Sequence, residues 1–396
     1  MNKKFKINKN IKKGHVMRVR TRDFIYTKDD LFFASTNYIH PEDRFISFLR
    51  YIPDENGDRE KDGKKYSKVT SEEAYNYLRE NYPEYLYFCD ISQVEMMGVP
   101  KDKIEKIIKP EERLSEIRKN EAKNSSQNQL IEKLLKVADF FHYKAGIAYE
   151  NLGISGSILP NLQKNTVSDI DFVVYGLENH RKAMKTFNEF KDVEVEIKID
   201  SDESNLDEPS KDSETQIEIK NITLNPIKDE YWEKIYNKRM KDSSLTKEEF
   251  CWYENRKNNR GIIEGTLFDI LATRNWDEIE GKWGNTRYEP VGIAKVETTV
   301  ENAIASFDNP ATYNVKDLKV LEVDSGDESL ISEVSEISSF THTYAGQAIE
   351  GEKIIAKGKV ERVIKENEES YRLIVGTTRE SIGEYIKLKK IPLNQN

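Results

Sequence analysis

Hydrophobic and polar positions alternate with the period of a β-strand along much of the chain up to residue 110, and turn-forming residues separate the alternating runs. The charged, glycine-containing segment 56–63 predicts a hairpin tip. Ser71 begins a predicted helix that ends near Glu80, and a second helix is predicted from Asp102 to Pro110. We therefore expect an N-terminal α+β domain over residues 1–110. Its predicted strands are 16–20, 23–27, 31–38 and 44–53.

The pattern changes after a polar connector at 111–129. Apolar positions three and four residues apart predict helices over 131–141 and 178–190. Between them lie two short apolar runs, the first ending in a Gly-Ser turn at Gly156 and Ser157. Alternating helices and strands are typical of a mixed sheet covered by helices, and we place this domain at 130–285. Its other predicted elements are strands 193–199, 216–224 and 265–272, an acidic loop at 201–215 and a helical region at 231–256.

The last part of the chain, residues 286–396, consists of short β runs at nearly regular spacing with glycines between them. This texture predicts a β-rich, barrel-like domain, for which a small antiparallel OB-like barrel is one candidate. The predicted fold class is thus α+β, with a central mixed sheet flanked by an N-terminal α+β domain and a C-terminal β-rich domain.

Composition limits the function classes. The 396-residue chain has a formal charge of −9 and a pI near 5.4, so overall charge does not favour a nucleic-acid binder. Residues 3–13 are rich in lysine, however, and such a basic arm can bind phosphate groups. Lysine-rich tails of this kind are more often only solvated. Two cysteines without C-x-x-C spacing and five scattered histidines give no zinc or disulfide pattern. No apolar run approaches the about 20 residues that span a bilayer, and the lysine-rich start does not resemble a signal peptide, so we expect a cytoplasmic protein.

Two acids, Asp169 and Asp171, interrupt the second apolar run of the central domain. Because side chains alternate faces along a strand, both carboxylates leave on the same side. Acids at this spacing are common on exposed edge strands, so the pair alone is a weak signal. Beside a core, however, two carboxylates repel each other and lose hydration, and a divalent cation is the usual compensation.

The combination of both features is more specific, with 11 residues between Ser157 and Asp169. A hydrophobic strand ending in Gly-Ser, followed by Asp-hydrophobic-Asp-hydrophobic, resembles the signature of the polymerase β-like nucleotidyltransferase superfamily. That superfamily includes CCA-adding enzymes, poly(A) polymerases, aminoglycoside nucleotidyltransferases and protein-modifying adenylyltransferases. The resemblance implies a nucleotidyltransferase sheet in which Gly156 lets the backbone approach a triphosphate and Ser157 donates to phosphate oxygens. It also implies that Asp169 and Asp171 hold Mg²⁺, or Mn²⁺ in its place.

The superfamily resemblance further implies a third acid on a neighbouring strand that completes the metal site. Asp269 is the candidate because it lies on the next convincing apolar strand, although an exposed edge-strand acid is an equally weighted interpretation and Glu264 or Glu218 are alternatives. Lys164 and Ser168, in the loop before the acids, are further candidates for contact with the nucleotide, although loop residues of this kind are usually only solvated.

The whole chain, including 22–25 and 40–44, also resembles an uncharacterised archaeal group of predicted nucleotidyltransferases. We expect a metal-dependent enzyme that moves NMP from an NTP, ATP foremost, to a hydroxyl and releases pyrophosphate. RNA or tRNA is the slightly favoured acceptor, because a basic arm and a β-barrel suit polyanions. A protein hydroxyl is the near alternative, and a non-catalytic nucleotide- or RNA-binding protein is the competing interpretation from another class.

Overall fold

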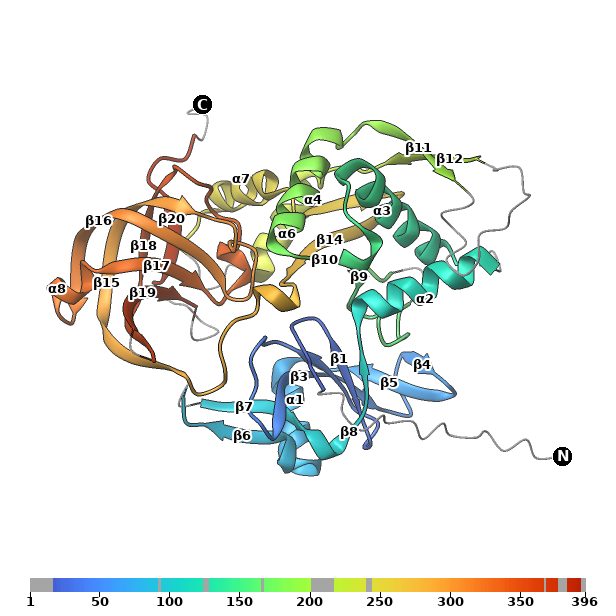
Figure 1. Cartoon of the computed structure of the whole chain (residues 1–396), viewed down its shortest axis with the longest axis horizontal. Helices are drawn as coiled ribbons and strands as arrows, with labels where there is room; N and C mark the ends of the chain where they lie inside the picture. The colour runs from blue at the N-terminus through green and yellow to red at the C-terminus, as the bar shows by residue number, and fades with distance from the viewer. Residues whose placement is uncertain are drawn as a thin grey trace.

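The computed structural model describes residues 17–91, 94–123, 128–164, 167–200, 217–239, 244–366, 368–376 and 383–392. They form a mixed α/β protein that is largely β, in which an N-terminal, a central and a C-terminal unit meet (Figure 1). The lysine-rich segment 3–13 and the acidic segment 201–215 lie outside the described residues. Within the described ranges, no helix is both long and apolar enough to cross a membrane.

The N-terminal unit is a curved sheet whose main path runs β4-β5-β3-β2-β1-β8, with β7 joined to β3 and β6 joined to β7. Alternating apolar residues of the central strands face a core that α1 covers. A capping box between Thr70 and Glu73 fixes the start of this helix. The elements are β1 (Phe24–Thr27), β2 (Phe32–Ser35), β3 (Arg44–Pro53), β4 (Arg59–Lys61), β5 (Lys64–Lys68), α1 (Ser71–Asn81), β6 (Leu86–Cys89), β7 (Val94–Pro100) and β8 (Ile104–Ile108).

The predicted helix at 102–110 is wrong. A short 3-10 turn leads instead into β8, where Ile107 pairs with Ile25 of β1. The isoleucines of this segment have helical spacing, but β-branched residues favour a strand where a partner edge is available. Pro110 therefore begins the next helix instead of ending one, as its fixed φ allows at a first helical position. Residues 17–20, predicted as part of a strand, have no regular structure.

The central unit is built on a sheet in the order β13-β14-β10-β9, in which β10 runs parallel to β14 and antiparallel to β9. Alternate residues of β10, such as Phe172, pack against α3 and α4 in one apolar core, so the residues between them face the other side of the sheet. Leu114 and Ile117 of α2 enter the same core, which makes the predicted connector part of this unit. The elements are α2 (Pro110–Lys123), α3 (Gln129–Ala145), β9 (Leu152–Ile154), β10 (Ile170–Tyr175), α4 (Leu177–Phe190), β13 (Arg260–Ile263) and β14 (Thr266–Thr273).

The remaining elements of the central unit confirm the predicted order of strands and helices. β11 and β12 pair with each other in a separate sheet. The predicted capping box between Thr246 and Glu249 begins α7. These elements are β11 (Glu194–Asp200), β12 (Ile217–Thr223), α6 (Asp229–Arg239) and α7 (Lys247–Lys257).

The C-terminal unit is a closed barrel. Its strands pair in the order β15-β16-β17-β19-β18, and β18 pairs back onto β15, while β20 extends from β18. The predicted antiparallel barrel needs one correction, because β17 and β19 run parallel. Trp232 and Phe250 from α6 and α7 join the barrel core, so the central unit packs against it. The elements are β15 (Thr286–Asn302), β16 (Ala311–Ser325), α8 (Glu328–Ile331), β17 (Val334–Ser339), β18 (Lys353–Lys365), β19 (Glu368–Val375) and β20 (Tyr385–Leu388).

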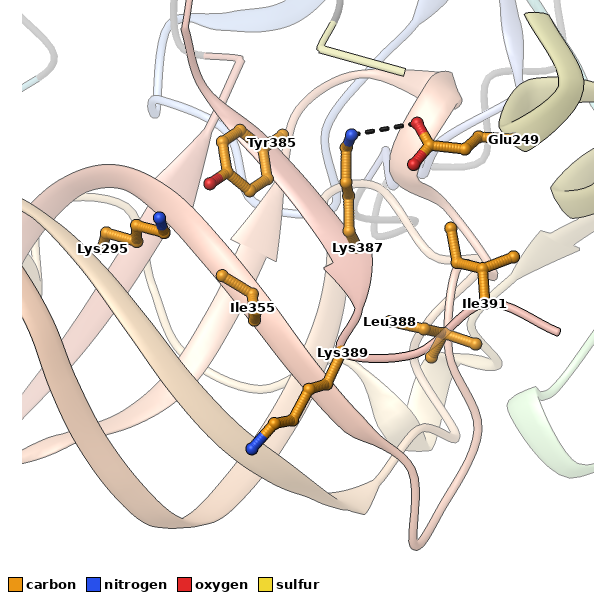
Figure 2. A pocket seen from close by; sticks show the side chains of 8 residues that line it. All are labelled: Glu249, Lys295, Ile355, Tyr385, Lys387, Leu388, Lys389 and Ile391. Atoms are coloured by element: carbon orange, nitrogen blue, oxygen red, sulfur yellow. Dashed lines mark hydrogen bonds and ion pairs between the residues drawn. The ribbon is translucent and has the colours of Figure 1, made fainter. Parts of the chain in front are cut away.

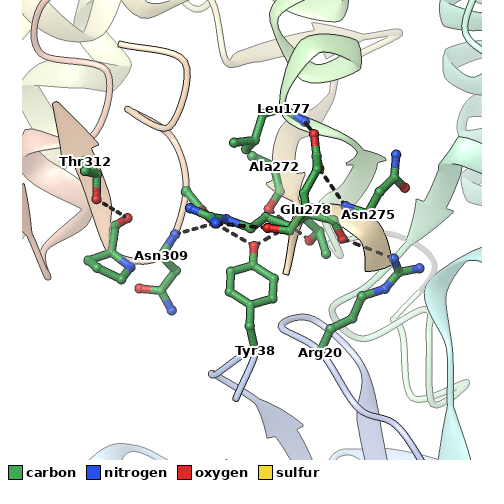
Figure 3. Close-up of polar contacts among 12 residues, drawn as sticks. Arg20, Tyr38, Leu177, Ala272, Asn275, Glu278, Asn309 and Thr312 are labelled. Carbon is green, nitrogen blue, oxygen red and sulfur yellow. Dashed lines mark hydrogen bonds and ion pairs between the residues drawn. The ribbon is translucent and has the colours of Figure 1, made fainter. Parts of the chain in front are cut away.

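A polar junction joins all the units beside the end of β14 (Figure 3). Tyr38 of the N-terminal unit donates its hydroxyl hydrogen to Asp308 of the C-terminal unit at 2.6 Å. Arg274, just after β14, donates from Nε to the other oxygen of Asp308 at 2.6 Å. The side chain of Arg20 donates to the carbonyl of Arg274 at 3.1 Å. These contacts fix both flanking units against the central sheet.

Candidate active site

The Gly-Ser turn lies directly against the acidic strand. Ser155 donates its backbone N–H to the carbonyl of Asp171 at 2.9 Å, which joins the end of β9 to β10. Gly156 follows in a left-handed conformation with a φ of 61°. A Cβ atom on this residue would lie 1.7 Å from Oδ2 of Asp171. Glycine is therefore required here, because any side chain would displace the carboxylate.

The sheet brings the predicted acids to one of its faces. Asp169 immediately precedes β10 and Asp171 lies within it, so both leave the face opposite to α3 and α4. In the parallel register, Asp171 is paired with Asp269 of β14. Residues paired across neighbouring strands point to the same side of a sheet, so Asp269 lies beside Asp171 despite their separation in sequence.

The carboxylates of Asp169 and Asp171 have no hydrogen-bond or ion-pair partner among the described residues. Loss of hydration raises the pKa of Asp171 to about 6, and repulsion from Asp269 and Asp169 adds to the rise. The pKa of Asp169 is also raised, first by loss of hydration and then by Asp269. Nearby cations, Arg22 and Arg50 for Asp171 and Arg260 and Lys68 for Asp169, offset only part of this rise in pKa.

This donor set fits a divalent cation. Mg²⁺ prefers oxygen ligands and is usually held by one or two protein carboxylates together with substrate phosphates. Asp169 and Asp171 supply two such carboxylates, and neither takes part in a hydrogen bond or ion pair within the described chain. A preformed cluster is not present: no three His, Cys, Asp or Glu side chains in the described ranges meet with metal-binding geometry. The site would thus hold a metal through two acids and the phosphates of a substrate.

Asp269 is engaged in an ion pair. Arg260 of β13 is its register partner and donates to both carboxylate oxygens, from Nε to one and from Nη2 to the other at 2.8 Å. The alternative acids lie elsewhere. Glu264 pairs with Lys136 of α3, the helix on the opposite face, and Glu218 belongs to β12 in a separate sheet. Asp269 is thus the candidate that the fold places next to the acidic pair.

The predicted site residues Ser157, Lys164 and Ser168 lie in the loop between β9 and β10, where hydrogen bonds join them. Ser157 donates its hydroxyl to that of Ser168 at 3.3 Å, and the Ser168 hydroxyl accepts the backbone N–H of Lys164 at 2.9 Å. The ammonium group of Lys164 pairs with Asp58 of the N-terminal unit. Ser157 is therefore linked by a hydrogen bond to Ser168, the residue before Asp169, whereas the charge of Lys164 is already compensated. Their contact with a nucleotide stays a prediction.

The N-terminal unit forms one wall of the site, which sequence reasoning did not predict. Tyr51 packs with Leu159 and Leu162, which follow the Gly-Ser turn, in a shared apolar cluster. Its strand and the neighbouring β5 bring two cations toward the acids. Arg50 of β3 opposes the rise in the pKa of Asp171, and Lys68 of β5, the register partner of Tyr51, opposes that of Asp169. No sequence motif marks these residues, because only the packing of one sheet against another brings them to the site.

A cavity of about 250 Å³ opens beside the acids. Asp171 and Asp269 line it from the sheet, Arg22 from the N-terminal unit, and Phe307 and His342 from the C-terminal unit. The cavity is therefore composite, and each of the flanking units contributes to its wall.

A larger cavity of about 490 Å³ lies on the outside of the barrel, between α7 and β20 (Figure 2). Three lysines line it, but Lys387 pairs with Glu249, and Lys389 pairs with Glu297. None of the predicted site residues lies there. The smaller cavity is therefore the candidate active site, because Asp171 and Asp269 line it.

The chain is similar along almost its entire length to the uncharacterised protein MJ1086 of Methanocaldococcus jannaschii. The two are 41% identical over 385 residues, which cover 94% of this chain and all of the relative. The chain belongs to the MJ1086 family. No protein-family model matches it, and no solved structure matches it either. Because the MJ1086 protein is itself uncharacterised, membership carries no activity with it.

The raised pKa of Asp171 predicts pH-dependent metal binding in this member of the MJ1086 family. A metal must displace the proton that Asp171 retains up to a pH of about 6. The affinity for Mn²⁺ should therefore be constant well above this pH and fall about tenfold per pH unit below it, for one displaced proton. Calorimetric titration with Mn²⁺ between pH 5 and pH 8 measures this, and Asp171→Asn should remove the slope. A flat profile for the wild type would contradict the assignment of Asp171 as a ligand.

Proposed function

We propose that this protein is a cytoplasmic, metal-dependent nucleotidyltransferase that transfers NMP from an NTP, ATP foremost, to a hydroxyl group. One observation carries the proposal: Asp169 and Asp171 are carboxylates without a hydrogen-bond or ion-pair partner among the described residues, their pKa values are raised, and Asp171 lies against a glycine that admits no side chain. Such an arrangement weakens the fold unless it binds a cation, and perturbed acids of this kind gather at functional sites. The resemblance of the motif to polymerase β-like enzymes supports this class of reaction.

Each residue of the site has a separate role in the proposed reaction. Asp169 and Asp171 would hold Mg²⁺ or Mn²⁺, which when bound stabilises the charge of the phosphates. The backbone at Gly156 and the hydroxyl of Ser157 would approach phosphate oxygens. The acceptor oxygen forms a bond to the α-phosphorus, and the bond from the α-phosphorus to the bridging oxygen breaks. Its electron pair leaves with pyrophosphate, and the hydroxyl proton passes to solvent.

Asp269 is proposed as the third acid, released from Arg260 when the nucleotide and metal bind. Asp269→Asn should then lower the single-turnover rate of transfer about 100-fold. Arg260→Gln, which removes the partner and keeps the acid, should lower it much less. Both variants lose the same ion pair, so equal losses of rate would show that Asp269 acts only through its contact with Arg260.

An RNA or tRNA acceptor is favoured over a protein. The closed order β15-β16-β17-β19-β18, with its parallel pair, resembles that of OB barrels, which commonly bind oligonucleotides. Phe307 and His342 of the C-terminal unit line the cavity. An RNA bound along the barrel would therefore place its end near the acids. A protein hydroxyl is the alternative acceptor.

The ion pair between Asp269 and Arg260 favours one competing function, a nucleotide- or RNA-binding protein without turnover. A binding protein needs a cation and phosphate site but no third acid. The two functions differ in whether a covalent product forms.

Transfer of label tests the proposal. Wild-type protein and an Asp169→Ala/Asp171→Ala variant are incubated with each α-labelled NTP, Mg²⁺ or Mn²⁺, and either total RNA or a protein lysate. We expect label in the RNA fraction with the wild type alone. Label in the protein fraction would identify the alternative acceptor. Equal labelling by both proteins would rule out the assigned acids, and metal-dependent binding without labelling would establish the binding protein.

A further inference from the structure

Arg22 presents an unpaired guanidinium group to the active-site cavity. It lines this cavity together with Asp171 and Asp269. The other cations of the lining are engaged: Lys257 donates to Glu254 at 2.6 Å, and Arg260 pairs with Asp269. Among the described residues, by contrast, no side chain forms a hydrogen bond or ion pair with the guanidinium of Arg22, whose charge acts on Asp171 only from a longer distance and lowers the pKa of that carboxyl. Its donors are free for a ligand that enters the cavity.

The backbone at Arg22 is held in an unfavourable conformation. Its φ of 75° lies in the left-handed region, which costs a residue with a side chain about 1 kcal/mol or more. Two contacts hold the residue there: its N–H donates to the carbonyl of Ser35 at 3.1 Å, and its carbonyl accepts the hydroxyl of Ser155 at 3.0 Å. Strained positions of this kind persist where the surrounding structure fixes them, and they gather at functional sites.

Arg20 attaches the same turn to the catalytic sheet. Its guanidinium lies over the ring of Tyr175 at 3.8 Å and over that of Trp276 at 4.6 Å, and it donates to Glu111 at 2.8 Å. Tyr175 is the last residue of β10, the strand that carries Asp171. The position of Arg22 relative to the acids is therefore set both by Arg20 and by Ser155.

We propose that Arg22 is a catalytic residue of the N-terminal unit that binds the β- and γ-phosphates of the NTP. The inference rests on the proposed function and adds a residue to its site. Ser155, which bonds to Arg22, directly precedes the Gly156 turn, so Arg22 lies at the end of the site where the phosphates would bind. A guanidinium group donates two parallel hydrogen bonds to phosphate oxygens.

The same position explains how Arg22 would accelerate the reaction. As the bond between the α-phosphorus and the bridging oxygen breaks, its electron pair and negative charge move onto pyrophosphate. A cation fixed at that end binds the departing group more strongly than the intact triphosphate, so it lowers the barrier. The rigid turn ensures that no reorganisation is needed when this charge develops.

Arg22→Asn tests the proposal without adding backbone strain, because asparagine tolerates the left-handed region. We expect binding of inorganic pyrophosphate and of ATP, measured by calorimetry with Mn²⁺, to weaken about tenfold or more, since charged hydrogen bonds are lost. Binding of AMP should change less than about twofold. The thermal midpoint should change little, because relief of the strained backbone offsets the lost attraction between Arg22 and Asp171. Arg18→Asn, a charge removed from the same segment but outside the cavity lining, should leave all three affinities unchanged.

The failure of this inference is distinguishable from the failure of the proposed function. Equal affinity of wild type and Arg22→Asn for pyrophosphate and ATP would overturn the role of Arg22 alone, if the Asp169→Asn/Asp171→Asn variant still loses binding. A parallel loss of AMP binding with a lower thermal midpoint would make Arg22 a structural residue. Absence of ATP and pyrophosphate binding by the wild type would overturn both proposals.

Discussion

Asp171→Asn should abolish nucleotidyl transfer and leave the metal-free protein at least as stable as the wild type. A carboxylate that holds the metal contributes several kcal/mol to stabilisation of the transition state, so a rate loss of about 1,000-fold is expected. In the metal-free protein, however, this carboxylate is desolvated and repelled by Asp269 and Asp169. Its neutral replacement should therefore raise the free energy of unfolding. Loss of activity together with gain in stability is typical of a functional residue and not of a structural one.

The pH dependence of this stability gain has a defined sign. The pKa of Asp171 is about 6 in the folded protein, against an ordinary value of 3.8. The folded state therefore binds the proton more tightly, and the free energy of unfolding of the wild type falls as pH rises through this window. The advantage of Asp171→Asn should be small at pH 4 and complete at pH 7, where it amounts to about 1 to 3 kcal/mol.

Chemical denaturation at both pH values and a single-turnover transfer assay measure these effects. Glu189→Gln, an exposed acid-to-amide change on α4, is the matched control and should alter neither rate nor stability. An Asp171→Asn protein that transfers nucleotide at the wild-type rate would remove the central residue from the mechanism.

Of the substitutions that add a single methyl group to the site, Gly156→Ala should be the most damaging to the rate of transfer and to stability. Its Cβ would lie 1.7 Å from Oδ2 of Asp171, so the carboxylate or the turn must move. A displacement of about 1 Å at a reacting centre costs about 100-fold in rate. The left-handed φ and the steric conflict together should lower the free energy of unfolding by about 3 kcal/mol.

Gly146→Ala separates the two causes. Gly146 ends α3 with a φ of 66°, close to that of Gly156, but a Cβ there would meet nothing within 4 Å. This control should lose only about 1 kcal/mol of stability, the cost of the backbone conformation, and keep full activity. If the two variants behaved alike in the transfer assay, the close approach of Gly156 to Asp171 would have no catalytic importance.

Local patterns were sufficient for the elements that carry the acids. Period-two alternation predicts that Asp169 and Asp171 share a face, and Ile170 together with the apolar run 172–174 predicts the buried strand that β10 forms. Helical spacing predicts α3 and α4, the helices that cover the other face. The same spacing was misleading at residues 102–110, because pairing of β8 with the edge of β1 outweighed the local pattern.

Long-range features of the site were not readable from the sequence. The parallel register that sets Asp269 opposite Asp171 depends on the whole path of chain between the two strands. The ion pair of Asp269 with Arg260 follows from that register as well. Arg22 belongs to a basic segment that is conspicuous in the sequence, but its place in the cavity depends on how the N-terminal unit packs on the central sheet. Such contacts have no periodic signal.

The most direct measurement is the affinity of the protein for Mn²⁺-ATP, determined by calorimetric titration of the wild type and of an Asp169→Asn/Asp171→Asn variant that retains its thermal midpoint. We predict saturable binding to the wild type and binding at least about 100-fold weaker to the variant, because two metal-ligating carboxylates are lost. Equal affinity of the two proteins for Mn²⁺-ATP would contradict the assignment of this acidic pair as a metal-nucleotide site.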